Sequence, residues 1–232
     1  MNRNIFGWER SGTKFLANAH EQNGYFNFGE FFNVFSCEVI KENIPYAKRL
    51  SISIQRDNRI KNKNLHAQNL YFQKAFLAKD RIELFQIHKH LTPSIVTVWI
   101  DDIKYAPSIL DIISDRYFLC TVRQNKTEQL LSSIITNYNL NFNGEEPTIS
   151  KKIEMKHVDY FYDRMKNTTI MQEEIVKNKK GRYVDFDALI SGNEDLGFEY
   201  KVTSIDQHED VTKYFINLTE VLDRISYLEK NT

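Results

Sequence analysis

The sequence predicts an α/β protein with three layers, in which helices cover both faces of a central, mainly parallel sheet. Two runs, at residues 94–100 and 117–122, are apolar throughout and do not alternate, which is typical of strands that are buried on both faces. These runs alternate along the chain with segments of helical periodicity, as in βα units. A length of 232 residues, with 41% hydrophobic residues and no visible internal repeat, favours one domain over residues 1–232.

The order of the elements follows from apolar spacing and from turn residues. A strand is expected at residues 4–8, and a helix at 13–22 follows a turn that contains glycine. Residues 41–66 are polar and basic, and we interpret them as a solvated excursion or as a loop beside the acceptor. The other elements are expected in this order: one or two helices at 67–90, a strand at 94–100, a helix at 107–114 that begins at a proline, a strand at 117–122, helices at 126–138 and 154–177, a short strand at 182–184 and a closing helix at 217–229.

Composition and charge exclude several classes of protein. Basic and acidic residues number 31 each, so we do not expect a general binder of nucleic acid, which carries an excess of positive charge. No apolar run reaches the roughly 18 residues of a membrane span, and the first residues lack the apolar stretch of a signal peptide. We therefore expect a cytoplasmic protein without a membrane span.

Cysteine and histidine do not indicate a metal site. Cys37 and Cys120 are far apart in apolar surroundings, and we interpret them as small buried hydrophobes. The six histidines have no ligand spacing that is supported by cysteine or acidic partners. We predict no structural metal.

The turn between the first strand and the first helix has the composition of an anion site. Backbone N–H groups at a helix N-terminus point to one place, and the helix dipole favours negative charge there. Two cations, two hydroxyls and a glycine that permits close approach are available to the anion: Arg10, Lys14, Ser11, Thr13 and Gly12. Alternatively, Ser11 or Thr13 simply caps the helix, and this alternative stays open.

The same turn partly matches a Walker A loop. Gly7 and Gly12 have the required spacing, but Thr13 precedes Lys14, whereas the motif places a lysine before the hydroxyl. The order matters, because the lysine reaches the terminal phosphates and the hydroxyl reaches Mg²⁺. Asp101 follows a buried strand, as a Walker B acid does, and Asp102 is next to it. An ATP-dependent P-loop kinase therefore remains an alternative.

Residues 10–16 also resemble a known family. Arg10, Ser11, Gly12 and Thr13, with a leucine at position 16, resemble the 5′-phosphosulfate loop of sulfotransferases that use 3′-phosphoadenosine 5′-phosphosulfate (PAPS). Lys14 stands where that family often has a second hydroxyl. The resemblance implies a P-loop-like sulfotransferase architecture and a donor site that contains these residues.

Two more segments extend the resemblance. Arg123 at a strand end and Ser132 in the following helix resemble the family's 3′-phosphate element, in which a guanidinium fork and a hydroxyl hold the phosphate. Glu30 follows a glycine-rich segment, where carbohydrate-type sulfotransferases of bacteria place their general base. Its neighbours Phe28, Phe31 and Phe32 are expected to desolvate it partly. His20 is the next candidate for the base.

The resemblance implies transfer of a sulfuryl group from PAPS to a hydroxyl of a small molecule, a carbohydrate or a lipid headgroup, without a metal. Glu30 would take the proton of the acceptor. Arg10 and the backbone N–H groups of Gly12, Thr13 and Lys14 would stabilise the leaving phosphate oxygen, and adenosine 3′,5′-bisphosphate (PAP) would be the product. A non-catalytic relative that binds a phosphorylated ligand or a protein partner is the other alternative.

Overall fold

The centre of the protein is a five-stranded sheet whose strand pairs are all parallel, in the order β2-β3-β1-β4-β5. The structure is a computed structural model, described for residues 1–8, 10–32, 85, 93–139, 150, 152–201 and 211–231. The strands are β1 (Arg3–Gly7), β2 (Phe26–Asn27), β3 (Ser94–Val98), β4 (Tyr117–Val122) and β5 (Gly181–Asp185). The predicted α/β class with a parallel sheet is confirmed. The interpretation of residues 41–66 lies outside the described residues, as does that of 67–90 except for Phe85.

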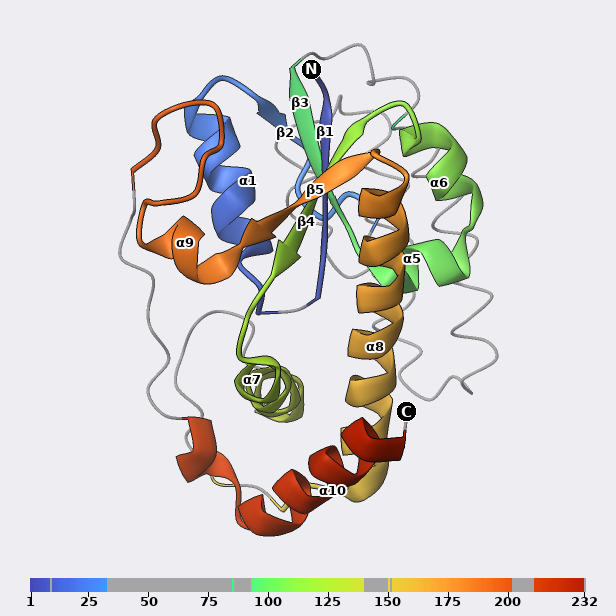
Figure 1. Ribbon diagram of the computed structural model, residues 1–232, viewed down its shortest axis with the longest axis vertical. Helices are drawn as coiled ribbons and strands as arrows, with labels where there is room; N and C mark the ends of the chain where they lie inside the picture. Colours follow the sequence, from blue (N-terminus) through green and yellow to red (C-terminus); the bar gives the residue numbers. More distant parts are fainter. Residues whose placement is uncertain are drawn as a thin grey trace, which may run out of the picture.

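Helices cover both faces of the sheet (Figure 1). On one face, α1 (Thr13–Gln22) and α9 (Phe186–Ile190) bury an apolar cluster that contains Ile5 and Leu119. On the other face, α5 (Ile100–Tyr105), α6 (Ser108–Ile113) and the upper part of α8 (Met155–Lys177) bury a second cluster around Phe6 and Val98. Alternate residues of β1, β3 and β4 thus enter different cores, which is why the sequences of β3 and β4 do not alternate between apolar and polar residues.

A third apolar cluster lies beyond the carboxyl ends of the strands. Here α7 (Lys126–Asn139), α8, a 3₁₀ turn (Val211–Tyr214) and α10 (Leu218–Asn231) pack together around residues that include Trp8. Figure 1 shows α7, α10 and the lower half of α8 gathered at this end of the sheet. None of the helices among the described residues is long and apolar enough to cross a membrane.

Several bounds differ from the prediction. The strand expected at 94–100 ends at Val98, because Asp102 Oδ2 accepts a hydrogen bond of 2.9 Å from Trp99 N–H and so starts α5. The short strand at 182–184 extends over Gly181–Asp185. The two-residue strand β2 and the short helices α5 and α9 were not expected. Cys120 is fully buried, and burial raises the pKa of its thiol to about 12, so the interpretation as a small hydrophobe is confirmed for this cysteine.

Candidate functional site

The loop after β1 depends on two glycines. A Cβ on Gly7 would stand 2.0 Å from Thr121 Oγ1 and 2.8 Å from Ser11 Oγ, so the loop folds back directly over the strand. Gly12 has a φ of +82°, and its Cβ would lie 2.6 Å from the ring of Phe186. Arg10 also has a positive φ, 62°. A left-handed conformation at a residue other than glycine is uncommon and occurs where other contacts hold the backbone.

The N-terminus of α1 has no side-chain cap. Gly12 is the N-cap residue, and its carbonyl accepts the first helical hydrogen bond from Leu16 at 2.9 Å. Ser11 is fully buried, and its hydroxyl donates to Trp8 O at 2.6 Å and pairs with Thr121 Oγ1 at 2.7 Å. The alternative in which Ser11 or Thr13 caps the helix is therefore wrong. The N–H groups of the first turn have no capping side chain and are available to an anion.

The structure gives the predicted loop residues different surroundings. Ser11 fixes the loop to the ends of β1 and β4 through the bonds just described. The side chain of Thr13 is buried, whereas that of Lys14 is exposed. Arg10 is half-buried and turns away from α1 toward α7. That these residues bind a donor stays a prediction.

Arg10 and Ser132 join two of the predicted motifs. Arg10 Nε donates a hydrogen bond of 3.1 Å to Ser132 Oγ, and 122 positions of sequence separate the two residues. Ser132 lies in the second turn of α7 and is buried. The guanidinium of the first loop thus reaches the hydroxyl that was expected to hold the other end of the donor.

Arg123 lies at the end of β4, on the far side of the same loop. Its guanidinium forms an ion pair with Glu128 of α7 and lies over the ring of Phe186, 5.1 Å from the ring centroid. Because Phe186 also packs against Gly12, one aromatic ring connects the two motifs. The sequence analysis missed Phe186. The sequence did contain a pattern that indicates this place, because an aspartate that can cap a helix follows the apolar part of a predicted strand. In the structure this aspartate is Asp185, whose Oδ1 accepts a hydrogen bond of 2.9 Å from Ala188 N–H.

Hydrogen bonds also connect the side chains around Arg123. Gln124 Nε2 donates to Asp185 Oδ2 at 3.1 Å and so ties the end of β4 to the end of β5. The hydrogen bond from Ala188 N–H holds the pKa of Asp185 below its usual value. Lys126, in the first turn of α7, is half-buried, and this burial lowers its pKa. Within the described parts of the chain, no carboxylate forms an ion pair with Lys126.

Glu30 lies at the same edge of the sheet, beyond β3. Gly29 O accepts a hydrogen bond of 2.8 Å from Thr97 N–H, so the chain that follows β2 continues alongside β3 as far as Gly29. Glu30 is half-buried, and its aromatic neighbours Phe28, Phe31 and Phe32 are buried, with their ring centroids 4.9, 5.7 and 5.2 Å from that of Phe85. Because β3 lies between β2 and β1, Glu30 and the loop are two strand spacings apart, about 10 Å.

The two aspartates of the kinase alternative are engaged by the protein itself. Asp101 forms an ion pair with Arg164 of α8, and the guanidinium of Arg164 lies over the indole of Trp8, 4.7 Å from its centroid. Asp102 accepts the hydrogen bond that begins α5. The described residues also contain no group of three or more His, Cys, Asp or Glu side chains that could ligate a metal ion.

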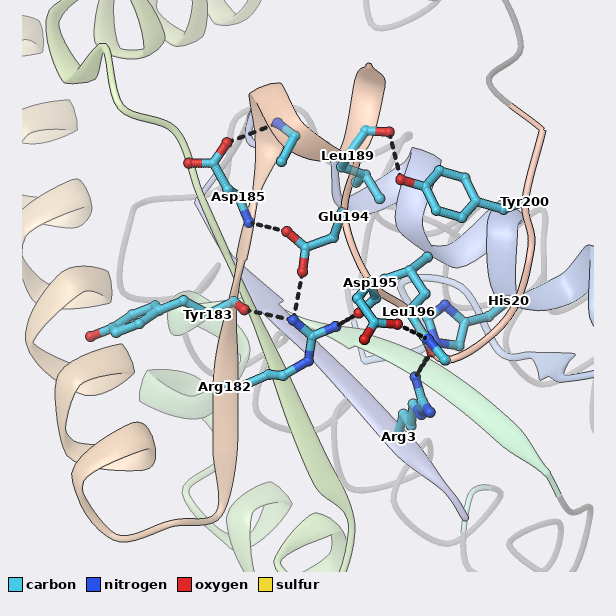
Figure 2. Close-up of polar contacts among 12 residues, drawn as sticks. Arg3, His20, Arg182, Tyr183, Asp185, Leu189, Glu194, Asp195, Leu196 and Tyr200 are labelled. Atoms are coloured by element: carbon cyan, nitrogen blue, oxygen red, sulfur yellow. Dashed lines mark hydrogen bonds and ion pairs between the residues drawn. The ribbon is translucent and has the colours of Figure 1, made fainter. Parts of the chain in front are cut away.

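His20 lies at the opposite edge of the sheet. Its Nε2 is 2.9 Å from Nη1 of Arg3, the residue at which β1 begins (Figure 2). Its Nδ1 is 2.8 Å from Leu16 O. Burial lowers the pKa of His20 to about 4. A neutral ring with a proton on Nδ1 donates to Leu16 and accepts from Arg3. The structure does not bring His20, the next candidate for the base after Glu30, to the loop, because α1 carries it toward the start of β1.

Polar contacts also attach residues 191–200 to β5. Arg182 Nη1 is 2.5 Å from Glu194 Oε1, and its other nitrogen donates to Asp195 O (Figure 2). Glu194 Oε2 in turn accepts a hydrogen bond of 3.1 Å from Asp185 N–H. These contacts fix the segment that follows α9.

Comparison with known proteins does not assign the chain. No protein-family model and no curated protein matches this sequence.

Proposed function

We propose that the protein is a sulfotransferase that moves a sulfuryl group from PAPS to the hydroxyl of a small molecule, a carbohydrate or a lipid headgroup. The observation that carries the proposal is the hydrogen bond between Arg10 and Ser132. The two residues come from two separate motifs that resemble the 5′- and 3′-phosphate elements of sulfotransferases. A donor with phosphates at both ends needs such elements close to each other.

The donor's 5′ end suits the N-terminus of α1. The uncapped N–H groups after Gly12 favour negative charge, and Arg10, from the same loop, adds a half-buried guanidinium that reaches Ser132 of α7. In the transfer, negative charge grows on the oxygen that bridges phosphorus and sulfur. Donors that are fixed before the reaction stabilise this charge without reorganisation.

The donor's 3′-phosphate suits Arg123 and Ser132. The stack on Phe186 holds the plane of the Arg123 guanidinium, so that less freedom is lost when it binds a phosphate. Glu128 is exposed and pairs with Arg123. A dianionic phosphate would share or replace this carboxylate as the partner of Arg123.

The acceptor hydroxyl would approach from the side of Glu30. The oxygen of this hydroxyl forms a bond to sulfur, and the hydroxyl proton passes to the Glu30 carboxylate. The bond between sulfur and the bridging oxygen breaks, and its electron pair stays on the oxygen of the leaving PAP. Glu30 therefore acts as a general base. The cations and N–H groups of the loop do the electrostatic work that Mg²⁺ does in phosphoryl transfer.

Choice of nucleotide tests the proposal. PAP at about 100 times its Kd should stabilise the folded protein by about 2.7 kcal/mol, which corresponds to a rise of roughly 5–10 °C in Tm for a chain of this size. ATP with Mg²⁺, which lacks a 3′-phosphate, should give a smaller shift. An equal or larger shift with ATP and Mg²⁺ that EDTA abolishes would replace the sulfotransferase by the kinase.

A further inference from the structure

Both tryptophans of the chain have an indole N–H that is buried without an acceptor. The protein has two tryptophans, and in each the Nε1 atom is inaccessible to solvent and has no hydrogen-bond partner among the described residues. An unsatisfied buried donor is costly, and in native proteins it often marks a functional group or a site for an unseen ligand or water. The two residues, Trp8 and Trp99, follow the adjacent parallel strands β1 and β3.

The register of the sheet places Trp99 beside the loop. Val98 is in register with Phe6, so Trp99 is level with Gly7, where the loop begins. On the other side, Thr97 N–H donates to Gly29 O, so the chain that leads to Glu30 runs next to the end of β3. Trp99 therefore lies at the carboxyl edge between the proposed base and the proposed phosphosulfate loop.

The pleat of β3 gives the side of the sheet on which Trp99 lies. Ile95 belongs to the cluster on the α1 face, and side chains of a strand share a face at every second residue, so Thr97 and Trp99 are on this face too. Trp99 keeps an extended backbone, with a φ of −106° and a ψ of 155°. On the same face, the absent Cβ of Gly7 would meet Ser11 and Thr13. The face that carries Trp99 is thus the face from which α1 begins.

We propose that the indole N–H of Trp99, which is covered in the free protein, becomes uncovered when the donor binds and then donates a hydrogen bond to an oxygen of the sulfuryl group during transfer. This inference rests on the proposed function. In an in-line transfer, sulfur lies between the leaving phosphate oxygen and the attacking hydroxyl. If the leaving oxygen is at the N-terminus of α1 and the attacking hydroxyl is at Glu30, then the strand between them is β3, and Trp99 directly follows this strand. A neutral donor at this position orients the sulfuryl oxygens without adding a further cation.

Trp8 provides a matched control on the opposite face. Its ring packs against Phe161, with centroids 6.2 Å apart, and lies under the guanidinium of Arg164. It is part of the apolar cluster formed by α7, α8 and α10. The two indole N–H groups therefore share burial and the lack of an acceptor, and differ in the face on which they lie.

Two indole N–H signals in a ¹H–¹⁵N NMR spectrum of the protein provide the test. Trp8→Phe removes one signal and so assigns both. On titration with PAPS, the Trp99 signal should move downfield as it gains an acceptor, and with PAP, which lacks the sulfuryl group, it should stay near its free position. The Trp8 signal should stay in place with both ligands.

Affinity gives a second readout. Trp99→Phe should weaken PAPS binding by about tenfold to a hundredfold relative to PAP, the usual effect of losing a hydrogen bond to a charged group. Trp8→Phe should leave the ratio of the two affinities unchanged. If Trp99→Phe does not fold, the NMR titration of the Trp8→Phe protein, in which the remaining signal is Trp99, decides alone.

The outcomes separate this inference from the proposed function. If PAP and PAPS both bind but the Trp99 signal responds equally to both, or to neither, then the role of Trp99 is overturned and the sulfotransferase proposal stands. If neither nucleotide binds, the proposed function fails, and the role of Trp99 fails with it.

Discussion

Arg10 and Ser132 meet across the candidate site, where the guanidinium Nε of one lies 3.1 Å from the hydroxyl of the other. Arg10 reaches Ser132 from a backbone with a positive φ. The contact connects the loop after β1 with the second turn of α7, and so connects the two segments that we assign to opposite ends of the donor. The predictions below test this arrangement one residue at a time.

The first prediction concerns the donor's 3′-phosphate. Arg123→Ala should weaken PAP binding by about 1.5–3 kcal/mol, the usual contribution of a hydrogen bond to a charged group. Adenosine 5′-phosphosulfate, which lacks this phosphate, should bind to the Arg123→Ala variant nearly as well as it binds to the wild type. Calorimetric titration of both ligands measures the difference.

Arg182→Ala is the control for Arg123. Like Arg123, Arg182 pairs with a carboxylate, that of Glu194, but it lies near the start of β5, away from the carboxyl edge. Its loss should leave PAP affinity unchanged. If Arg123→Ala weakens both nucleotides to the same extent, then Arg123 supports the fold and does not read the 3′-phosphate.

The second prediction concerns the base. Glu30→Gln keeps the shape of the side chain but cannot accept a proton, so sulfuryl transfer should fall by roughly 10²–10⁴, while PAP affinity and Tm stay close to those of the wild type. Slow hydrolysis of PAPS, with water in place of the acceptor, serves as the assay until an acceptor is found. Glu21→Gln, at an exposed glutamate that bonds to Asn27 at 3.0 Å, is the control and should retain the activity. Turnover that survives in Glu30→Gln would remove this residue from the mechanism.

The third prediction concerns the contact between Gly12 and Phe186. Gly12→Ala forces a Cβ to 2.6 Å from the ring of Phe186 and also places alanine at a φ of +82°. Gly24 has nearly the same φ, +80°, with no atom within 4 Å of the added Cβ. Gly24→Ala should therefore cost only the backbone term of about 1 kcal/mol, and Gly12→Ala about 1–3 kcal/mol more, because of overpacking. Urea denaturation measures the free energy of unfolding of the two variants. Equal losses of stability would contradict the prediction, because they would mean that the ring of Phe186 moves aside without an energetic cost.

The fourth prediction concerns pH. The pKa of His20 is lowered by burial from 6.5 to about 4, so between these values the unfolded chain binds a proton that the folded protein does not. The stability of the fold is therefore complete above pH 6.5 and is lost as the pH falls toward 4, by on the order of 3 kcal/mol. Denaturation at a series of pH values in this range measures the slope.

His20→Gln should remove most of that slope, whereas His157→Gln should keep it. His157 lies in α8, far along the chain from the contacts of His20 with Arg3 and Leu16. A wild-type protein that is equally stable at both ends of this pH range would contradict the buried, neutral state of His20.

Helices and strands could be predicted where the residue pattern that indicates them lies within one short segment of the sequence. The strand at 117–122 and the helix at 13–22 have the predicted bounds, because an unbroken apolar run and a glycine turn are local features. The two-residue strand β2 forms through pairing with β3, far along the chain, and no local pattern indicates it. Trp99 and Ile100 continue an apolar run, but the strand ends because Trp99 N–H donates a hydrogen bond to the carboxylate of Asp102.

The candidate site was predictable in part, for the same reason. Arg10, Gly12, Arg123 and Ser132 could be selected from short motifs, and the sheet brings them to one edge. The position of Phe186 against Gly12 depends on how α9 packs against α1, which is a tertiary contact. The placement of His20 at the other edge follows from the direction of α1, and spacing along the sequence could not reveal it.

A crystal structure of the protein with bound PAP tests the central claim most directly. We expect the 5′-phosphate at the N–H groups that follow Gly12, and the 3′-phosphate within hydrogen-bond distance of both Arg123 and Ser132. The nucleotide would then span the contact between Arg10 and Ser132 that the structure contains without it. A nucleotide bound elsewhere, or one whose 3′-phosphate contacts neither Arg123 nor Ser132, would contradict the assignment of this edge of the sheet as the donor site.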